Sequence, residues 1–154
     1  MEEKKARQLS LGLIESSGLA YLGTVDGDGY PQIRAMANLK CKAEYPELEQ
    51  VFAGHEGDFL MYFATGTRSV KMGHIKANPK VSIYFCDAKG MQTLLLGGTA
   101  KAVSDEKLKK AIWQDRWTKH FEGGVDDPEY AVISVKPDFA RGWCGQEAFE
   151  FKLK

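Results

Sequence analysis

The chain has 154 residues, of which 44% are hydrophobic and 27% charged, and this ordinary globular composition excludes disorder as its main state. Its 21 basic and 21 acidic residues give a formal net charge of zero, so no overall field draws the chain to nucleic acid or to a membrane. We expect a single domain over residues 1–154 that binds neither partner and holds any anion at a local site.

The cysteines and the first residues predict where the protein works. Cys41, Cys86 and Cys144 are odd in number and widely spaced, which favours free thiols in a reducing compartment over disulfides. Residues 1–5 lack the apolar core of a signal peptide, and the uncharged run at residues 91–100 is too short to span a bilayer. We therefore expect a cytoplasmic protein.

Hydrophobic periodicity predicts a succession of short helices and strands. Apolar residues recur at helical spacing over residues 6–14, and Gly18 ends that run. Further helices are expected before Asn78, which closes one of them, and from Ser104 to Gly123. Apolar runs bounded by turn residues predict strands at residues 19–25, 30–39, 58–64, 81–86, 91–103, 130–135 and 148–153.

The links between these strands indicate the fold class. Asp-Gly pairs at residues 26–29 predict a hairpin turn, and Gly97-Gly98 inside a strand predicts a bulge or a close approach by another backbone or a ligand. Residues 43–46 stay ambiguous, because Pro46 disfavours both a strand and a helix. No strand–helix–strand rhythm repeats, and closing the sheet removes its edges. The sequence predicts an α+β, mainly β fold: an antiparallel barrel of about seven strands with short flanking helices.

The motifs of several functional classes are missing. No glycine is followed directly by lysine, which excludes the phosphate loop of nucleoside triphosphatases. His55, His74 and His120 share no metal-ligand spacing with one another or with the cysteines, so we expect solvated or helix-surface histidines and no metal. No serine lies in a nucleophile elbow. A zinc enzyme and a hydrolase with its own nucleophile are therefore disfavoured.

The stretch from residue 63 to residue 71 has the chemistry of a phosphate site. A strand ends, a glycine permits a tight turn, and a helix begins, whose first amides lack partners and lie at its positive end. Hydroxyls of Thr65, Thr67 and Ser69 with the charge of Lys71 suit a phosphate monoester. The alternative is that Thr67 or Ser69 only caps the helix and Lys71 is a solvated surface charge.

A second cation lies in the predicted return strand of the hairpin. Alternation along residues 32–38 places side chains on opposite faces of this strand. One face carries Arg34, Met36 and Asn38, and the other carries Ile33, Ala35 and Ala37. An arginine flanked by apolar residues needs a partner, because burying it unpaired is costly. A phosphate and a nearby carboxylate are both candidates for that partner.

The order of these features resembles the pyridoxamine 5'-phosphate oxidase-like family of flavin mononucleotide (FMN)-binding split barrels. Arg-x-Met in a hairpin strand is followed by a strand ending in threonine, then Ser-x-Lys, Asn-Pro, a long strand bearing glutamine, and a helix. The similarity extends from about Gly18 to Pro137 and is greatest to the short general-stress-protein branch, of which residues 121–137 are also typical.

The resemblance implies an antiparallel split β-barrel that forms a homodimer, with FMN at the subunit interface. It assigns the flavin phosphate to Arg34 and Lys71, with hydrogen bonds from Thr65 and Ser69. It assigns the flavin ring to Ala35, Met36, Ala37, Ala64, Gln92 and Trp143. The register of Gln92 is open by one residue because of the glycine pair, and a core position is the alternative for Trp143.

The resemblance also implies an FMN-dependent oxidoreductase with an unidentified small substrate or acceptor. Pyridoxamine-phosphate oxidases carry a late Arg-x-His that residues 141–149 lack, so we do not expect this enzyme's vitamin B6 reaction. No residue is an evident proton donor, and we assign no catalytic residue. The alternatives are a non-catalytic flavin-binding, flavin-buffering or redox-sensing protein, and a deazaflavin or no cofactor in place of FMN.

Overall fold

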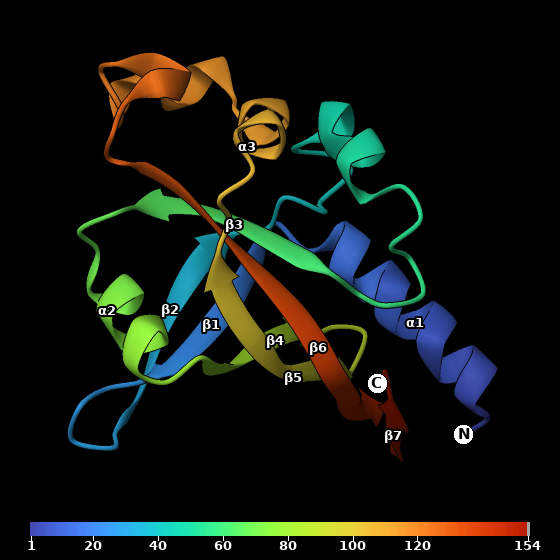
Figure 1. Cartoon of the computed structure of the whole chain (residues 1–154). Coiled ribbons are helices and arrows are strands. Elements are labelled where there is room, and N and C mark those ends of the chain that lie inside the picture. The colour runs from blue at the N-terminus through green and yellow to red at the C-terminus, as the bar shows by residue number, and fades with distance from the viewer. Residues whose placement is uncertain (154) are drawn as a thin grey trace.

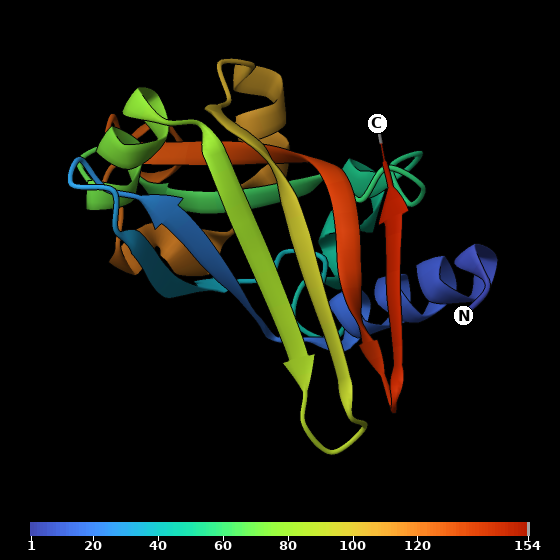
Figure 2. The same cartoon turned by 90° about the horizontal axis from the view of Figure 1, so that it is seen from below.

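In the computed structural model, which describes residues 1–153, seven strands form one antiparallel sheet in the order β2-β1-β4-β5-β6-β3, and β7 pairs with β6 (Figure 1). The sheet curls into a half-barrel (Figure 2). The strands are β1 (Leu19–Val25), β2 (Pro31–Ala37), β3 (Met61–Gly66), β4 (Lys80–Asp87), β5 (Gln92–Ala102), β6 (Tyr130–Cys144) and β7 (Glu147–Lys152).

Three α-helices and three short 3-10 helices flank the sheet. They are α1 (Glu3–Ser16), α2 (Val70–Ala77), α3 (Glu106–Ile112), η1 (Pro46–Phe52), η2 (Asp115–Lys119) and η3 (Gly124–Asp126). The fold class predicted from the sequence, an antiparallel barrel with short flanking helices, is confirmed. Over residues 1–153, no helix has the length and apolar character needed to cross a membrane.

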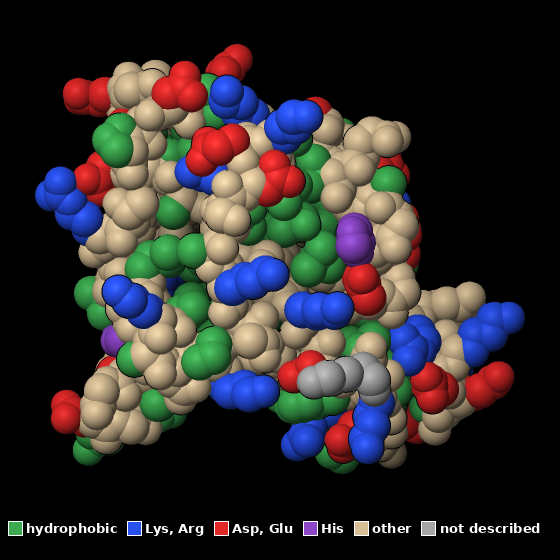
Figure 3. Space-filling model, viewed as in Figure 1, with side chains coloured by type: hydrophobic (Ala, Val, Ile, Leu, Met, Phe, Trp, Pro, Cys, Tyr) green, Lys and Arg blue, Asp and Glu red, His purple; other side chains and the backbone are tan. Residues whose placement is uncertain are grey.

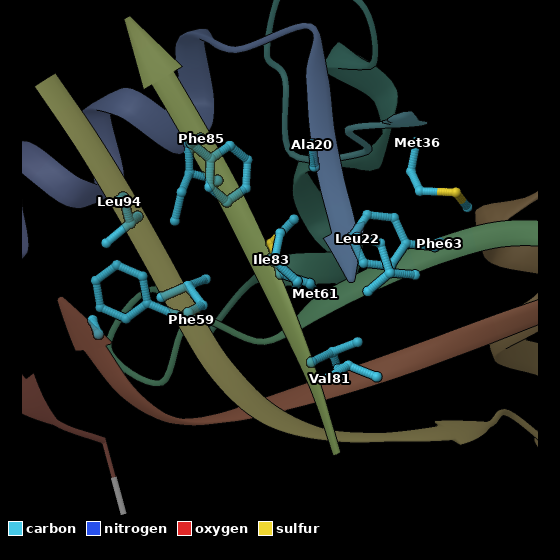
Figure 4. Packing of buried hydrophobic residues seen from close by; sticks show 14 of the residues in the cluster. Ala20, Leu22, Met36, Phe59, Met61, Phe63, Val81, Ile83, Phe85 and Leu94 are labelled. Atoms are coloured by element: carbon cyan, nitrogen blue, oxygen red, sulfur yellow. The ribbon is translucent and has the colours of Figure 1, made fainter. Parts of the chain in front are cut away.

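The first hydrophobic core fills the concave side of the half-barrel. Leu22, Ile83 and Leu94 point inward from three strands toward Phe63 and Phe85 (Figure 4). Helix α1 packs against β4, β5 and β7 and covers this core. The alternation of side chains along β1 and β4 is the cause, because Ala20, Leu22 and Thr24 are buried in turn on β1, and Val81, Ile83 and Phe85 on β4.

A second core lies on the opposite side of β3. Met61 and Phe63 enter the first core, whereas Tyr62, between them, joins the second core beneath η1 and α3. Aromatic rings dominate this second core, and Tyr130 Oη donates a hydrogen bond to the carbonyl of Lys109 at 2.8 Å. Burial raises the pKa of Tyr130, so its hydroxyl remains a donor. Strand β3 is thus held between two apolar layers.

Several strand boundaries differ from the sequence-based prediction, and two of these differences have a visible cause in the backbone or in hydrogen bonds. The strand expected from residue 58 begins at Met61, because Phe59 has φ 58°, a left-handed conformation that interrupts extended backbone. The strand expected to reach residue 39 ends at Ala37, since buried Asn38 donates to the carbonyls of Ile14 and Ser17 instead of extending the sheet. The prediction of one continuous helix from Ser104 to Gly123 was also wrong. These residues form α3 and η2, with a break between the two helices.

The predicted bulge at Gly97-Gly98 is confirmed. The register of β5 against β6 shifts there, with Gly97 opposite Phe139 and Gly98 opposite Pro137, which leaves Asp138 without a partner. A bulge accommodates proline inside a sheet, so β6 continues through Pro137, where the sequence predicted the end of a strand. A Cβ atom at Gly98 would lie 2.3 Å from the carbonyl oxygen of Lys136.

This close approach predicts a large cost for Gly98→Ala. The added methyl group must displace the Lys136 backbone, so we expect the free energy of unfolding to fall by about 1–3 kcal/mol. Gly12→Ala in α1 is the matched control, because no atom lies within 4 Å of its Cβ position. This control should be neutral or stabilising by up to about 1 kcal/mol in urea titration. Equal stabilities for the two variants would contradict the packing described for the bulge.

Candidate functional site

Strands β1 and β2 place Arg34 at the inner side of the half-barrel. Arg34 lies opposite Leu22 in the ladder, and its Nη1 donates to the Leu22 carbonyl at 3.1 Å and to Thr24 Oγ1 at 2.7 Å. The predicted alternation is confirmed, because Met36 is buried on the same face and Ile33 is exposed on the other. Two neutral acceptors hold the guanidinium in one orientation and leave its charge uncompensated.

The turn from β3 into α2 brings Lys71 to the same place. Lys71 lies in the first turn of α2, and its Nζ donates to Thr65 Oγ1 at 2.9 Å. The hydroxyls of Thr65 and Ser69 are 3.2 Å apart and share a hydrogen bond. The chain thus places two hydroxyls and one ammonium group around the start of a helix, as the sequence predicted for residues 63–71.

The electrostatics of this cluster are those of two cations without a counterion. Burial lowers the pKa of Lys71, and the positive charge of Arg34 lowers it further. Over residues 1–153, no carboxylate oxygen lies within 4.0 Å of either cationic group, although nine such pairs occur elsewhere. A pair of half-buried like charges without an acid between them is costly and would be relieved by an anion.

These contacts decide between the alternatives that the sequence left open. Arg34 has no carboxylate partner in the described chain. Ser69 occupies the N-cap position of α2, but its side chain accepts no capping hydrogen bond and contacts Thr65 instead. Lys71 is half-buried rather than a solvated surface charge. The arrangement therefore favours an anion with several oxygen atoms as the missing partner.

Sequence reasoning missed two members of this cluster. Thr24 Oγ1 accepts the hydrogen bond from Arg34 and shares a second one with His74 Nδ1 at 2.9 Å. His74 was predicted to be a solvated or helix-surface histidine, and in the structure it lies on α2 and is half-buried. The spacing of Lys71 and His74, three residues apart in a helix, was the one available signal that they share a face.

The residues predicted to contact a flavin ring fall into two groups. Ala37 ends β2 and Ala64 lies on β3, and both line a hollow of about 480 Å3 with Trp117, His120 and Phe121. Such a hollow has the size of a small-molecule site. Ala35 is exposed on the face of β2 that also carries Ile33, whereas Met36 is buried in the first core.

Gln92 and Trp143 lie apart from the cationic cluster. Gln92 begins β5 next to the β4–β5 turn, and its amide donates to the Leu9 carbonyl of α1 at 2.8 Å. Trp143 is 55% exposed on β6, so it is no core tryptophan. Pairing across the sheet aligns Arg34 with Leu22, then with Ile83 and finally with Leu96 of β5. Leu96 is four residues along β5 from Gln92, so neither Gln92 nor Trp143 reaches the cluster around Arg34 within one chain.

An apolar surface covers the convex face of the sheet. Ile33 is 72% exposed there, and neighbouring strands add further exposed side chains, namely Leu19, Tyr21, Tyr84 and Trp143. The face in Figure 3 is different in character, because basic and acidic side chains both surround its hydrophobic ones. Contiguous exposed apolar surface of this kind marks an interaction site.

Residues 8–144 match the sequence profile of the family described as pyridoxamine 5'-phosphate oxidase. The chain belongs to this family. General stress protein 26 of Bacillus subtilis (strain 168) is 30% identical over 90 residues, which are 56% of this chain and 63% of that protein. The chain thus matches less than two thirds of the curated relative's length.

Solved structures agree with this membership. A protein of Clostridium acetobutylicum, described as related to general stress protein 26 and to the pyridoxinephosphate oxidase family, is 26% identical with a TM-score of 0.78. The match covers 98% of this chain and 96% of that one. A heme binding protein of Mycobacterium smegmatis shares the fold at 12% identity, with a TM-score of 0.68 over 96% of this chain and 58% of its own.

The uncompensated cations predict that the protein binds inorganic phosphate. Phosphate should raise the melting temperature relative to chloride at equal ionic strength, by about 2–4 °C for each kcal/mol of stabilisation. Lys71→Met should abolish this difference, and Lys76→Met, which removes an exposed lysine from the same helix, should keep it. A phosphate effect that survives Lys71→Met would place the anion elsewhere.

Proposed function

We propose that this family member is an FMN-binding oxidoreductase that works as a homodimer in the cytoplasm and acts on a small substrate or electron acceptor. The observation that carries the proposal is the pair Arg34 and Lys71, each of which donates to a different threonine hydroxyl, on Thr24 and on Thr65. Burial and the charge of Arg34 lower the pKa of Lys71, and no carboxylate of residues 1–153 pairs with either cation. A phosphate monoester is the anion that best fits two cations and two hydroxyl donors.

The phosphate of FMN fits this donor set by charge and by geometry. It carries up to two negative charges, and it offers acceptor oxygens for a guanidinium that already uses Nη1 on Leu22 and Thr24. Lys71 and the hydroxyls of Thr65 and Ser69 supply further donors from one turn of chain. The bound anion would also remove the repulsion that lowers the pKa of Lys71.

The hollow bounded by Ala37 and Ala64 is the place that we propose for the ring. Small side chains on β2 and β3 let a flat heterocycle approach the backbone, and Phe121 and Trp117 offer apolar surface beside it. When bound, the flavin supplies the electron-transfer chemistry of the reaction. The side chains of this chain bind the phosphate, orient the ring and limit access of water to it.

The exposed convex face supports a homodimer. A symmetric two-fold interface would bury Ile33, Tyr21 and Tyr84, which are exposed in the isolated chain. Trp143 lies on this same face, and Gln92 lies at the end of β5 next to it. Both residues are distant from Arg34 and Lys71 of the same subunit. Their predicted roles at a flavin therefore require the copies that a second subunit contributes.

Loss of either cation should weaken FMN much more than riboflavin. Charge-assisted hydrogen bonds contribute about 1.5–3 kcal/mol each, so we expect Arg34→Ala and Lys71→Ala to weaken FMN about tenfold to a hundredfold. Riboflavin has the same ring without the phosphate and should be nearly unaffected. Fluorescence titration measures both, with Lys76→Ala as the control. Folded variants of Arg34 and Lys71 that bind FMN as tightly as the wild type would refute the phosphate assignment.

Ile33→Asp should dissociate the homodimer without unfolding the chain. Ile33 is 72% exposed in one subunit, so a carboxylate there costs little until the interface buries it unpaired. Light scattering should give the dimer mass for the wild type and the monomer mass for this variant. Tyr30→Asp, at an exposed position in the β1–β2 turn, is the control and should remain dimeric. A monomeric wild type at micromolar concentration would contradict the proposed assembly.

Anaerobic spectra test whether bound flavin turns over. For an oxidoreductase, we expect a reduced nicotinamide nucleotide to bleach the bound flavin and an added acceptor to restore its absorbance. Bound flavin that no donor reduces would favour the alternative, a flavin-binding or redox-sensing protein without turnover. A protein that takes up no FMN would refute both.

A further inference from the structure

A buried lysine, Lys40, lines a cavity that includes neither Arg34 nor Lys71 of the proposed flavin site. Lys40 follows β2, is only 8% exposed, and its Nζ is buried without a hydrogen-bond partner among the described residues. Its Nζ lies 5.1 Å from the centroid of the Phe52 ring, whose π face attracts a cation. Three ammonium donors thus lack an acceptor.

This lysine lines a cavity of about 130 Å3 between α1, η1 and the loop that connects β2 to η1. Five of its ten lining residues carry apolar or aromatic side chains, namely Leu11, Leu39, Tyr45, Pro46 and Phe52. The volume is close to that of a cavity known to hold a single benzene molecule. A ligand of this size would lie within reach of Nζ and bury its apolar surface on the surrounding side chains.

The charges around the cavity restrict the ligand to a neutral molecule. Glu15, Glu49 and Glu56 line the cavity, and one further lysine, Lys42, pairs with two of them. This excess of acids disfavours an anion, while the ammonium group of Lys40 disfavours a cation. What remains is a neutral molecule with an acceptor oxygen for the unpartnered donors.

We propose that this cavity binds a small neutral aldehyde or ketone, of single-ring or short-chain size, whose carbonyl oxygen accepts a hydrogen bond from Lys40 Nζ. The site is independent of the proposed flavin chemistry. Burial lowers the pKa of Lys40 to about 8, although Asp58, Glu15 and Glu56 oppose the change. A substantial fraction of neutral amine is therefore present near that pH, which makes Lys40 open to trapping by an aldehyde.

The decisive comparison uses acetophenone and ethylbenzene, which differ in one carbonyl oxygen. In amide-resolved NMR titrations, acetophenone should shift the signals of Leu11 and Leu39 in the wild type. Lys40→Met should lower the affinity ratio of acetophenone to ethylbenzene about tenfold to a hundredfold, since it removes the charged donor but keeps an apolar stem. Lys42→Met, at the same cavity, should keep the ratio of the wild type.

A second experiment, covalent labelling of the wild-type protein, tests the proposal without relying on the Lys40→Met variant. Benzaldehyde condenses with the Nζ of a neutral lysine and releases water, and cyanoborohydride donates hydride to the imine carbon, which leaves a benzylated amine. Peptide mapping should find Lys40 modified faster than exposed Lys101, and acetophenone should slow this reaction. The proposal is refuted if acetophenone leaves the cavity signals unchanged, if Lys40→Met keeps the ratio, or if Lys40 reacts no faster than Lys101.

Discussion

The repulsion between Arg34 and Lys71 is maintained by the packing of the whole half-barrel. Arg34 is fixed by the ladder between β1 and β2, and Lys71 by the turn that joins β3 to α2. Strand β3, which leads into this turn, is itself held between two hydrophobic cores. The fold thus half-buries Lys71 near a second cation, and burial and the charge of Arg34 both lower its pKa. A bound anion would offset both effects.

Buried positive charge is a recurring feature of this electrically neutral chain. Arg34 donates to the carbonyl of Leu22 and the hydroxyl of Thr24, and Lys71 donates to the hydroxyl of Thr65. Lys40 Nζ instead lies over the ring of Phe52 and has no hydrogen-bond partner among the described residues. In both places a cation lacks its full complement of acceptors, but the surroundings differ. Hydroxyl donors beside Arg34 favour a phosphate, and the apolar lining around Lys40 favours a neutral ligand. The two proposed sites thus differ in chemistry and in place, one at the strands β1 and β2 with the start of α2, the other between α1 and η1.

Local patterns predicted much of the fold and of the cationic cluster. Strand β1 occupies the predicted residues, and alternation placed Arg34 on the inner face of β2. The extension of β6 through Pro137 was missed, because only the partner strand reveals that a bulge accommodates the proline. The start of β3 was missed for a similar reason, since the positive φ of Phe59 follows from tertiary packing rather than from local sequence.

The site itself depends on contacts that no spacing encodes. Thr24 and His74 are 50 residues apart, and they meet only because α2 packs against β1. The sequence was equally unable to show that no carboxylate of residues 1–153 pairs with Arg34, because sequence alone does not tell which acids fold onto which cation. Family resemblance supplied the flavin interpretation, and the geometry of the cluster gives that interpretation its physical basis.

A crystal structure of the protein grown with FMN would show directly whether Arg34 and Lys71 hold the flavin phosphate. We expect phosphate oxygens within hydrogen-bond distance of both the Arg34 guanidinium and Lys71 Nζ, with the ring in the hollow beside Ala37 and Ala64. A flavin bound with its phosphate away from both cations would refute this assignment, as would a crystal in which a carboxylate of a second subunit pairs with Arg34 and Lys71.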